Sequence, residues 1–343
     1  MINIDASTLT QGIDYSQFLE EYYTGLSSGS STYHGGEPDA AFGGMYYVSG
    51  PEVSFTYGDE NAQMALLVGE EIAYDFIHYG PAFGHGISGE VNEVIFGYAD
   101  EHTGTDDDTP NGLVTGLDVG VRVTGLELVG EPGAGNDPET NPVYAIYDAV
   151  RNGLNVEEGE DHIATLYDIF GAEAQSFTGS FFDDTYVGTD WGDSIRGNDG
   201  DDDFRGHDAD DMIFGGAGND FLGGGKGVDV IRGGLGDDTI EGGAKMDKLF
   251  GGEGGDSFLY TGANQSKISD QDRILDFETG VDNIDLTALE LTLVEEFTGT
   301  ADEVLIETVR GKDFVRADMT GDGENDFSIM VRNGTVEDGD LLL

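Results

Sequence analysis

The chain has no cysteine among its 343 residues, so neither a disulfide nor a thiolate metal site can stabilise it. Basic residues are also scarce: 14 stand against 70 acidic residues, which gives a formal net charge of −56. Nucleic acids and anionic lipids are bound through basic surfaces, so this charge excludes the first as a partner and disfavours the second. Metal cations and neutral or amphipathic ligands remain.

Long apolar runs are a third absence. No stretch is long enough to span a bilayer, so we expect no membrane insertion. The start, MINIDASTLTQGIDYSQF, has no basic region and no apolar run, so it does not read as a Sec-type signal peptide. The large negative charge keeps copies apart and favours a monomer, but it also opposes compaction unless cations are bound.

Glycine and aspartate, by contrast, are abundant and ordered in a nine-residue repeat. Read in nines from Gly188, the chain gives eight units up to residue 259 without an insertion, and GSFFDDTYV from Gly179 adds a degenerate ninth. The sixth position is aspartate and the eighth is apolar in every unit. The candidate metal ligands are the sixth-position aspartates of the eight regular units, Asp193, Asp202, Asp211, Asp220, Asp229, Asp238, Asp247 and Asp256.

The chemistry of this pattern points to calcium. Glycines allow tight loops whose carbonyls turn to one side, and carbonyl and carboxylate oxygens are the hard ligands that Ca²⁺ takes. The apolar eighth residue marks a short strand that faces a thin core, and one unit cannot bury that face alone, so the units must stack. A disordered glycine-rich linker is the alternative, but a linker would not keep aspartate and an apolar residue in register.

Residues 179–259 resemble the RTX repeats of bacterial proteins that are exported by type I secretion. The resemblance implies an all-β parallel β-roll with Ca²⁺ between successive turns, so that the ligands on one side come from every second unit, such as Asp220 with Asp238. The first three regular units lack the second glycine and are expected to bind more weakly. Lys245 stands at a fourth position and argues against a full site there.

The last part of the chain, residues 260–343, fits the same kind of secreted protein. Residues 269–289 resemble the segment that follows the repeats in serralysin C-terminal domains, and the final DGDLLL resembles an uncleaved type I secretion signal. ADMTGDGENDF begins like an EF-hand loop, but Ile329 stands where the twelfth-position glutamate belongs, so we expect a tight β-hairpin. These features predict an extracellular protein whose repeats fold when they meet calcium.

The first 175 residues form a separate domain in this interpretation. One helix is expected after Asp14, in SQFLEEYYTGL, and two more over 142–154 and 158–170, where apolar residues recur at helical spacing. Runs with strand-like alternation lie between them. The order predicts an α+β fold, an antiparallel sheet with helices on one face. The expected domains are therefore 1–175, 179–259 and 260–343.

Signatures of an enzyme are few. There is no HExxH motif, so the serralysin-like tail brings no zinc protease with it. GLSSG at 25–29 follows a helix-like segment rather than the strand that a nucleophile elbow needs. We therefore expect no catalytic activity.

His34, Tyr74, His78 and His85 lie in glycine-rich surroundings. On its own, a histidine in such a loop is a solvated residue, and Tyr74 in an alternating strand is a core tyrosine. Residues 1–172 nevertheless resemble the secreted HasA-type hemophores, through IDYSQFLEEYYTG, HGG, FGG, AYDF, PAFGHGISGEVNEVIFG and VRVTGLELVG in that order. The resemblance implies that His34 and Tyr74 are the axial ligands of ferric haem b. It also implies that His85 hydrogen-bonds the Tyr74 phenol oxygen, with His78 as a rival partner.

The leading hypothesis is a hemophore-like haem-acquisition protein. It would be secreted by a type I system, folded by calcium, and able to pass haem to an outer-membrane receptor. One alternative is a secreted RTX hydrolase whose active site uses carboxylates of the N-terminal domain. Another is a calcium-dependent adhesin in which His34 and Tyr74 have no special role. A coloured haem complex, turnover of a glycan, lipid or ester, or calcium-dependent surface binding would separate the three.

Overall fold

The computed structural model describes residues 1–24, 26, 30–34, 49–57, 63–74, 87–99, 103–105, 114–115, 117–131, 134, 136, 138, 140–152 and 162–343. The chain forms two compact units. Unit 1 consists of Met1–Leu9 and Gln17–Glu173, and unit 2 of Thr10–Ser16 and Ala174–Leu343. Within the described residues, no helix is both long enough and apolar enough to cross a bilayer.

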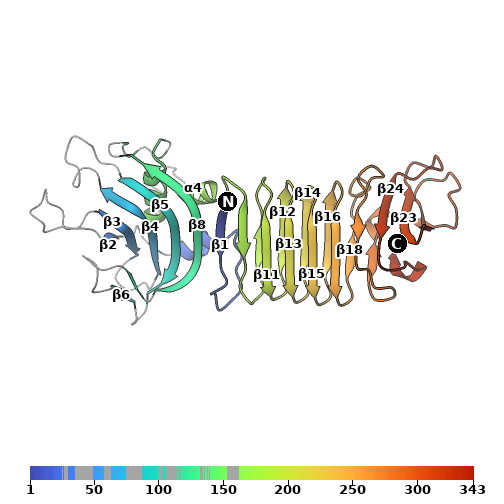
Figure 1. The fold of residues 1–343 in the computed structure, drawn as a ribbon, viewed down its shortest axis with the longest axis horizontal. Helices are drawn as coiled ribbons and strands as arrows, with labels where there is room; N and C mark the ends of the chain where they lie inside the picture. Colours follow the sequence, from blue (N-terminus) through green and yellow to red (C-terminus); the bar gives the residue numbers. More distant parts are fainter. Residues whose placement is uncertain are drawn as a thin grey trace, which may run out of the picture. The chain divides into compact units, whose positions relative to one another are not determined.

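Unit 1 is built on an antiparallel sheet with the strand order β2-β3-β4-β5-β8-β1 (Figure 1). Its strands are β1 (Ile2–Asp5), β2 (Ser30–His34), β3 (Ser49–Thr56), β4 (Gln63–Tyr74), β5 (Ile87–Tyr98) and β8 (Asp118–Gly130). A separate short pair consists of β6 (Gly104–Thr105) and β7 (Val114–Thr115). The alternating apolar residues of the strands face the core, as the period of two requires. Val53, Phe55 and Tyr57, for example, are all buried.

Among the described residues of unit 1, three helices pack on one face of this sheet: α1 (Phe18–Tyr23), α3 (Pro142–Asn152) and α4 (His162–Phe170). Phe96 of β5 joins them, because its ring lies 5.7 Å from that of Phe18 and 6.5 Å from that of Phe170. The predicted α+β class is therefore confirmed. Residues 153–161, which the sequence divides between the two later helices, lie outside the described residues.

The start of α1 differs from the prediction. The helix begins at Phe18 with Gln17 at its N-cap, not after Asp14. The reason is that residues 10–16 are part of unit 2. Ile13 and Tyr15 bond through their main chain to Thr185, at 2.7 and 2.9 Å. Asp14 therefore forms a bridge to Thr185, and residues 15–17 form a turn ahead of the helix.

Unit 2 is a parallel β-roll, as predicted, in which successive strands alternate between two sheets (Figure 1). Sheet A contains β9 (Gln175–Thr178), β11 (Ser194–Asp199), β13 (Met212–Ala217), β15 (Val230–Leu235), β17 (Lys248–Glu253) and β19 (Arg273–Ile274). Sheet B contains β10 (Thr185–Val187), β12 (Asp203–Asp208), β14 (Phe221–Lys226), β16 (Thr239–Ala244), β18 (Ser257–Leu259), β20 (Asn283–Asp285) and β25 (Leu341–Leu342).

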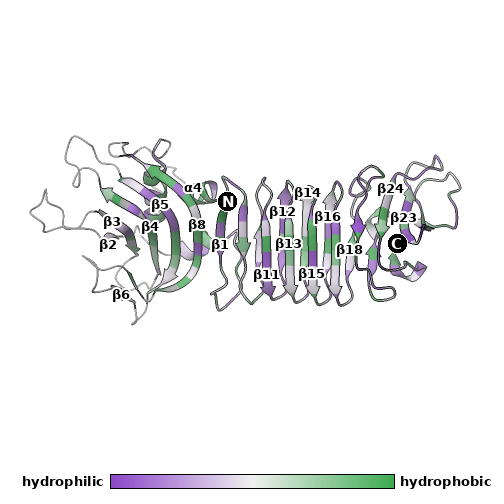
Figure 2. Ribbon diagram, viewed as in Figure 1, coloured by the Kyte–Doolittle hydropathy of each residue, from purple (hydrophilic) through white to green (hydrophobic). Residues whose placement is uncertain are grey.

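Two repeats make one turn of the roll, so strands in one sheet pair at a distance of 18 residues, as in Ile195 with Ile213 and Phe204 with Leu222. Each repeat places its eighth residue in the space between the sheets, where all of these side chains are buried. Figure 2 shows the same hydrophobic residues recurring on successive strands. Each repeat therefore contributes the apolar side chain of its eighth residue to the core of the roll.

The roll does not stop at residue 259. Strand β19 pairs with β17, and β20 with β18, although 25 or 26 residues now separate the partners. Residues 260–343 are thus continuous with the repeats and share one compact unit with them, because their strands extend the same two sheets. Beyond β19, sheet A continues in the order β24 (Phe327–Val331), β23 (Lys312–Asp318), β22 (Glu303–Val309) and β21 (Thr292–Leu293). Strand β23 is antiparallel to both β22 and β24.

The loop between β23 and β24 is a hairpin, as the sequence predicts. The Asp318 carboxylate accepts the main-chain N–H groups of Gly321 and Gly323, each at 2.7 Å. Asp326 accepts those of Met319 and Thr320 in the same way. The acidic residues of this loop therefore fold the turn through their own hydrogen bonds.

Candidate functional site

The sixth-position aspartates of the repeats form two hydrogen-bonded rows, one beside each sheet. In each row the main-chain N–H of one aspartate donates to Oδ1 of the aspartate 18 residues further on, for example from Asp202 to Asp220 at 2.9 Å. Ladder A contains Asp193, Asp211, Asp229 and Asp247. Ladder B contains Asp184, Asp202, Asp220, Asp238 and Asp256.

The second carboxylate oxygen is buried and has no partner within unit 2 in most of these residues. All of the side chains are at most 3% exposed. The Oδ2 atoms without a hydrogen bond belong to Asp202, Asp211, Asp220, Asp229, Asp238, Asp247 and Asp256. A buried carboxylate oxygen that lacks a partner is costly, so the fold requires something to neutralise it.

Each Oδ2 faces a small space that glycine keeps open. A methyl group on Gly215 would clash with Oδ2 of Asp220 and would lie 2.9 Å from the carbonyl oxygen of Gly233, one turn further on. The first glycines of the neighbouring units, Gly197, Gly206, Gly224 and Gly233, stand in the same relation to their aspartate and to a glycine carbonyl. Carboxylate and carbonyl oxygens of successive turns therefore converge on the same spaces.

The electrostatics of the rows call for a cation. Loss of hydration on burial raises the pKa of Asp202 and Asp211 to about 8, with a further rise from neighbouring aspartates, although a main-chain N–H works against it. The pKa of Asp220 and Asp229 is raised to about 6, again chiefly by burial. A bound cation inverts this preference and favours the charged carboxylate.

These residues fit Ca²⁺ better than a transition metal. No three His, Asp or Glu side chains converge on one point in the described part of the chain. An ion between the turns would therefore take one or two carboxylates and complete its shell with main-chain carbonyl oxygens. Calcium accepts such an all-oxygen shell of six to eight ligands, whereas zinc prefers nitrogen and sulfur.

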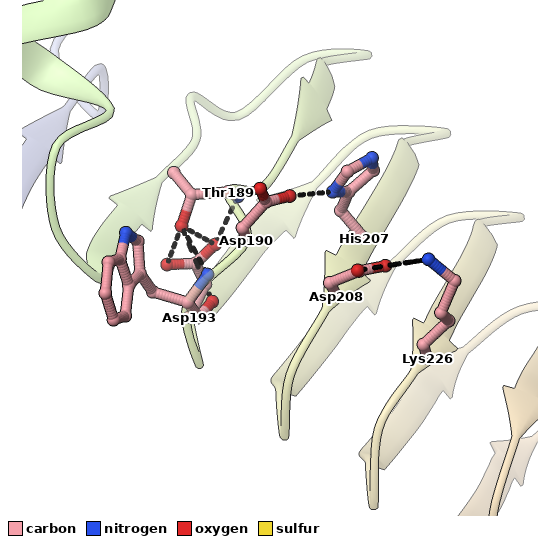
Figure 3. Close-up of polar contacts among 7 residues, drawn as sticks. Thr189, Asp190, Asp193, His207, Asp208 and Lys226 are labelled. Atoms are coloured by element: carbon pink, nitrogen blue, oxygen red, sulfur yellow. Dashed lines mark hydrogen bonds and ion pairs between the residues drawn. The ribbon is translucent and has the colours of Figure 1, made fainter.

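The first two units differ from the others. Both Asp193 oxygens already accept hydrogen bonds, from the main chain and hydroxyl of Thr189 (Figure 3). Oδ1 also accepts the N–H of Gln175 at 2.6 Å. Ser180 caps Asp184 in the same manner. A hydroxyl-bearing residue thus replaces the second glycine in these two units. Asp202 and Asp211 of the next two units, where weaker binding was also expected, keep an Oδ2 without a hydrogen-bond partner, so that expectation stays a prediction.

The structure adds two aspartates that the repeat pattern missed. Asp272 accepts the N–H of Asp247 at 2.8 Å and Asp282 that of Asp256 at 3.0 Å, so both ladders gain one more rung. Oδ2 of Asp272 is buried without a hydrogen-bond partner, and burial raises the pKa of this carboxyl to about 9. The signal was present in the sequence: Asp-x-Ile at Asp272–Ile274 and Asp282–Ile284 repeats the sixth-to-eighth spacing outside the nine-residue frame.

The predicted haem ligands lie on two strands of unit 1. Strands β2 and β4 are both antiparallel to β3, so they run in the same direction. His34 is the last residue of β2 and Tyr74 the last residue of β4. Both residues therefore lie toward the same end of the sheet, with β3 between them. They are not level with each other, because His34 pairs with Glu52, which pairs with Val68, and Tyr74 lies six residues beyond Val68. His78 and His85 lie outside the described residues.

Comparison with known proteins finds matches to parts of the chain. Residues 193–343 match the family model of the peptidase M10 serralysin C terminal. Serralysin A and Serralysin C of Dickeya chrysanthemi are 48% and 46% identical over 54 residues, which is 15% of this chain but only 11% of each relative. The expected resemblance of the C-terminal region to serralysins is confirmed. The aligned segment covers a small part of each serralysin, and most of the length of those proteins lies outside the alignment.

Solved structures similar to this chain include two of HasA. One is a HasA mutant monomer from Yersinia pseudotuberculosis, 13% identical, with a TM-score of 0.37, covering 49% of this chain and 88% of that one. Another is the holo hemophore HasA of Yersinia pestis, 15% identical, with a TM-score of 0.36 over 49% and 88% of the two chains. A subunit of the mannuronan C5-epimerase of Azotobacter vinelandii is 25% identical over 40% of this chain and 91% of its own, with a TM-score of 0.33.

Proposed function

We propose that this chain is an extracellular, non-catalytic protein that binds ferric haem through unit 1 and folds its roll around Ca²⁺. The observation that supports haem binding best is the position of His34 and Tyr74 at the same end of two parallel strands. Export by a type I system and transfer of haem to an outer-membrane receptor belong to the same proposal. They rest on the resemblance to secreted hemophores and to the serralysin C terminal.

Calcium has a structural role in this proposal. The Oδ2 atoms of the two ladders and the glycine carbonyls of the next turn would hold the ions, and the ions would remove the repulsion among buried carboxylates. Because these sites exist only when the turns are stacked, the free energy of ion binding becomes free energy of folding. In calcium-poor surroundings the acidic turns repel one another and stay unfolded.

The haem site follows from ligand chemistry. Ferric iron is a hard acid, and a tyrosine phenolate is a hard anionic oxygen ligand that proteins use for haem. An ordinary tyrosine titrates near 10, so a hydrogen-bond donor beside Tyr74 would help to keep the oxygen deprotonated at neutral pH. His85 and His78 are the candidates for that donor. His34, at the end of β2, which β3 separates from β4, would supply the second axial ligand.

A visible absorption titration of the calcium-loaded protein with ferric haem tests the proposal. We expect saturation at a single equivalent, a tyrosinate-type spectrum that is lost in Tyr74→Phe, and weaker binding in His34→Ala. Tyr98→Phe is the matched control, since Tyr98 pairs with Gln63 at the opposite end of the sheet and is 42% exposed. A spectrum equal to that of free haem, or an equal change in both tyrosine variants, would remove the assignment.

A further inference from the structure

The outer face of sheet B carries a groove of about 600 Å³. Strand β14 is its floor, with Gly223 in register between Arg205 of β12 and Glu241 of β16. Arg205 and His207 belong to one wall, and Glu241 with residues 261–265 belongs to the other. The groove lies entirely within unit 2, and Gly224 in its lining also borders Oδ2 of Asp229 in ladder A.

The groove exists because one outward-facing side chain is missing. Gly223 is the ninth residue of its unit. In all eight other units the ninth residue bears a side chain: Val187, Arg196, Arg205, Phe214, Arg232, Glu241, Phe250 and Leu259. A Cβ on Gly223 would meet nothing closer than Cγ of Arg205 at 3.8 Å, an ordinary contact, and Gly223 has no left-handed backbone. Gly225, by contrast, has φ +108° and is pressed against a carbonyl. Folding requires glycine at 225 but not at 223.

The walls of the groove are fixed and nearly balanced in charge. Glu241 Oε1 accepts hydrogen bonds from Thr261 Oγ1 at 2.7 Å and Gln265 Nε2 at 2.6 Å. The Arg205 guanidinium lies 5.2 Å from the ring centre of Phe221. His207 Nδ1 is 2.9 Å from Asp190, and Lys226 Nζ is 2.9 Å from Asp208 (Figure 3).

These walls exclude several kinds of ligand. The main chain of β14 is paired on both sides, so an extended peptide finds no free strand edge in the floor. A polyanion is disfavoured because Arg205 and Lys226 are already paired with aspartates and the whole protein has a charge of −56. A wholly apolar ligand would cover the charged Arg205, Lys226 and Glu241 side chains of the lining without offering them a hydrogen bond.

We propose that this groove binds a neutral saccharide. Planar guanidinium, carboxylate and amide groups on opposite walls can exchange hydrogen bonds with neighbouring sugar hydroxyls, and the glycine floor beside Phe221 accepts the C–H face of a pyranose ring. The volume falls in the range of small-ligand sites, roughly 300–1,000 Å³. This proposal does not depend on the haem proposal, since each concerns a different unit.

Isothermal titration of the full, calcium-loaded chain with neutral tetrasaccharides tests it, using cello-, xylo-, laminari-, manno- and chito-oligosaccharides as probes. We expect at least one to bind. Gly223→Gln should fill the groove and weaken binding at least ~10-fold, the effect of losing a good hydrogen bond or its space. Arg232→Gln is the matched control, because it places the same side chain at the ninth position on sheet A; it should bind like the wild type.

Two results would overturn the saccharide site: no binding of any probe, or equal binding by Gly223→Gln and the wild type. Circular dichroism with calcium checks that the variant folds. If it does not fold, Arg205→Ala decides instead, because its exposed side chain can be removed without opening the core; undiminished binding in this variant then overturns the proposal and weaker binding supports it. The haem spectrum of each variant should equal that of the wild type, so the two proposals are scored separately.

Discussion

The two units hold themselves together by different means. Unit 1 has a broad aromatic core, in which the hydroxyls of Tyr23 and Tyr57 lie 3.3 Å apart and both donate to the carbonyl of Val150. The repeats of unit 2 bury one apolar eighth-position side chain for every nine residues. The repeats also bury carboxylates whose Oδ2 atoms lack a hydrogen-bond partner, and in the proposed function a bound cation neutralises them.

Removal of calcium should produce the largest difference in stability between the two units. With EDTA, we expect unit 2 to lose its β-structure and its amide protection, while α3, α4 and the sheet of unit 1 keep theirs. Hydrogen exchange measured by mass spectrometry, peptide by peptide, reads both units in one sample. Protection of the peptides over 194–259 that EDTA leaves unchanged would refute the dependence on calcium.

Substitution of single aspartates should show which carboxylates of the roll make its folding depend on calcium. Asp229→Asn removes a charged oxygen that lacks a partner, so we expect the calcium midpoint of folding to rise, by an amount equivalent to on the order of 1–3 kcal/mol. Asp193→Asn is the control from the same ladder, since Thr189 and Gln175 already saturate that carboxylate. Its calcium midpoint should move much less. Equal shifts would mean that the partnerless Oδ2 does not identify the ligands.

A change of pH should have a smaller effect on the stability of the roll. Acidification should stabilise the calcium-free roll and destabilise the calcium-loaded roll. The pKa of Asp202 is about 8 and that of Asp220 about 6 in the folded, calcium-free roll, both above the unfolded value of about 3.9. A raised folded pKa means that protonation favours the folded state. The calcium-free roll should therefore gain stability as pH falls from 8 through 6, and reach its full gain near 4.

With calcium present, protons compete with the ion for the same oxygens, so affinity should fall over that range. Circular dichroism against pH, at zero and at saturating calcium, measures both arms. A calcium-free chain whose β-structure does not increase on acidification from pH 8 to pH 5 would contradict the assignment of these carboxylates.

The roll could be predicted from the sequence almost residue by residue, because one physical rule repeats without interruption. Asp220, Leu222 and their equivalents fix both the turn and the core. The rule became invisible where its period changed: Asp272 and Asp282 lie 25 and 26 residues from their partners, so counting in nines could not find them. What remained to signal them was the local Asp-x-Ile spacing.

Unit 1 was predictable only in outline. Alternation gave the strands and helical spacing gave the helices, since both periods depend on local geometry. The start of α1 was wrong, because residues 13–15 pair with Thr185, a partner about 170 positions away that no local pattern can reveal. The haem ligands stay predictions: the strands place His34 and Tyr74 at one end of the sheet, and the iron chemistry awaits the titration.

The segment at residues 13–15 also has a consequence for solubility. The first strand of sheet B, β10, would otherwise expose a row of unpaired main-chain groups, which is a template for the strand of another molecule. Tyr15 and Ile13 occupy that row through Thr185, and Gly12 fits closely against the carbonyl of Asp183. A stack of identical turns has no intrinsic end, and here a short piece of chain from the far end of the sequence provides one. It protects the roll from growing, copy upon copy, into a fibre.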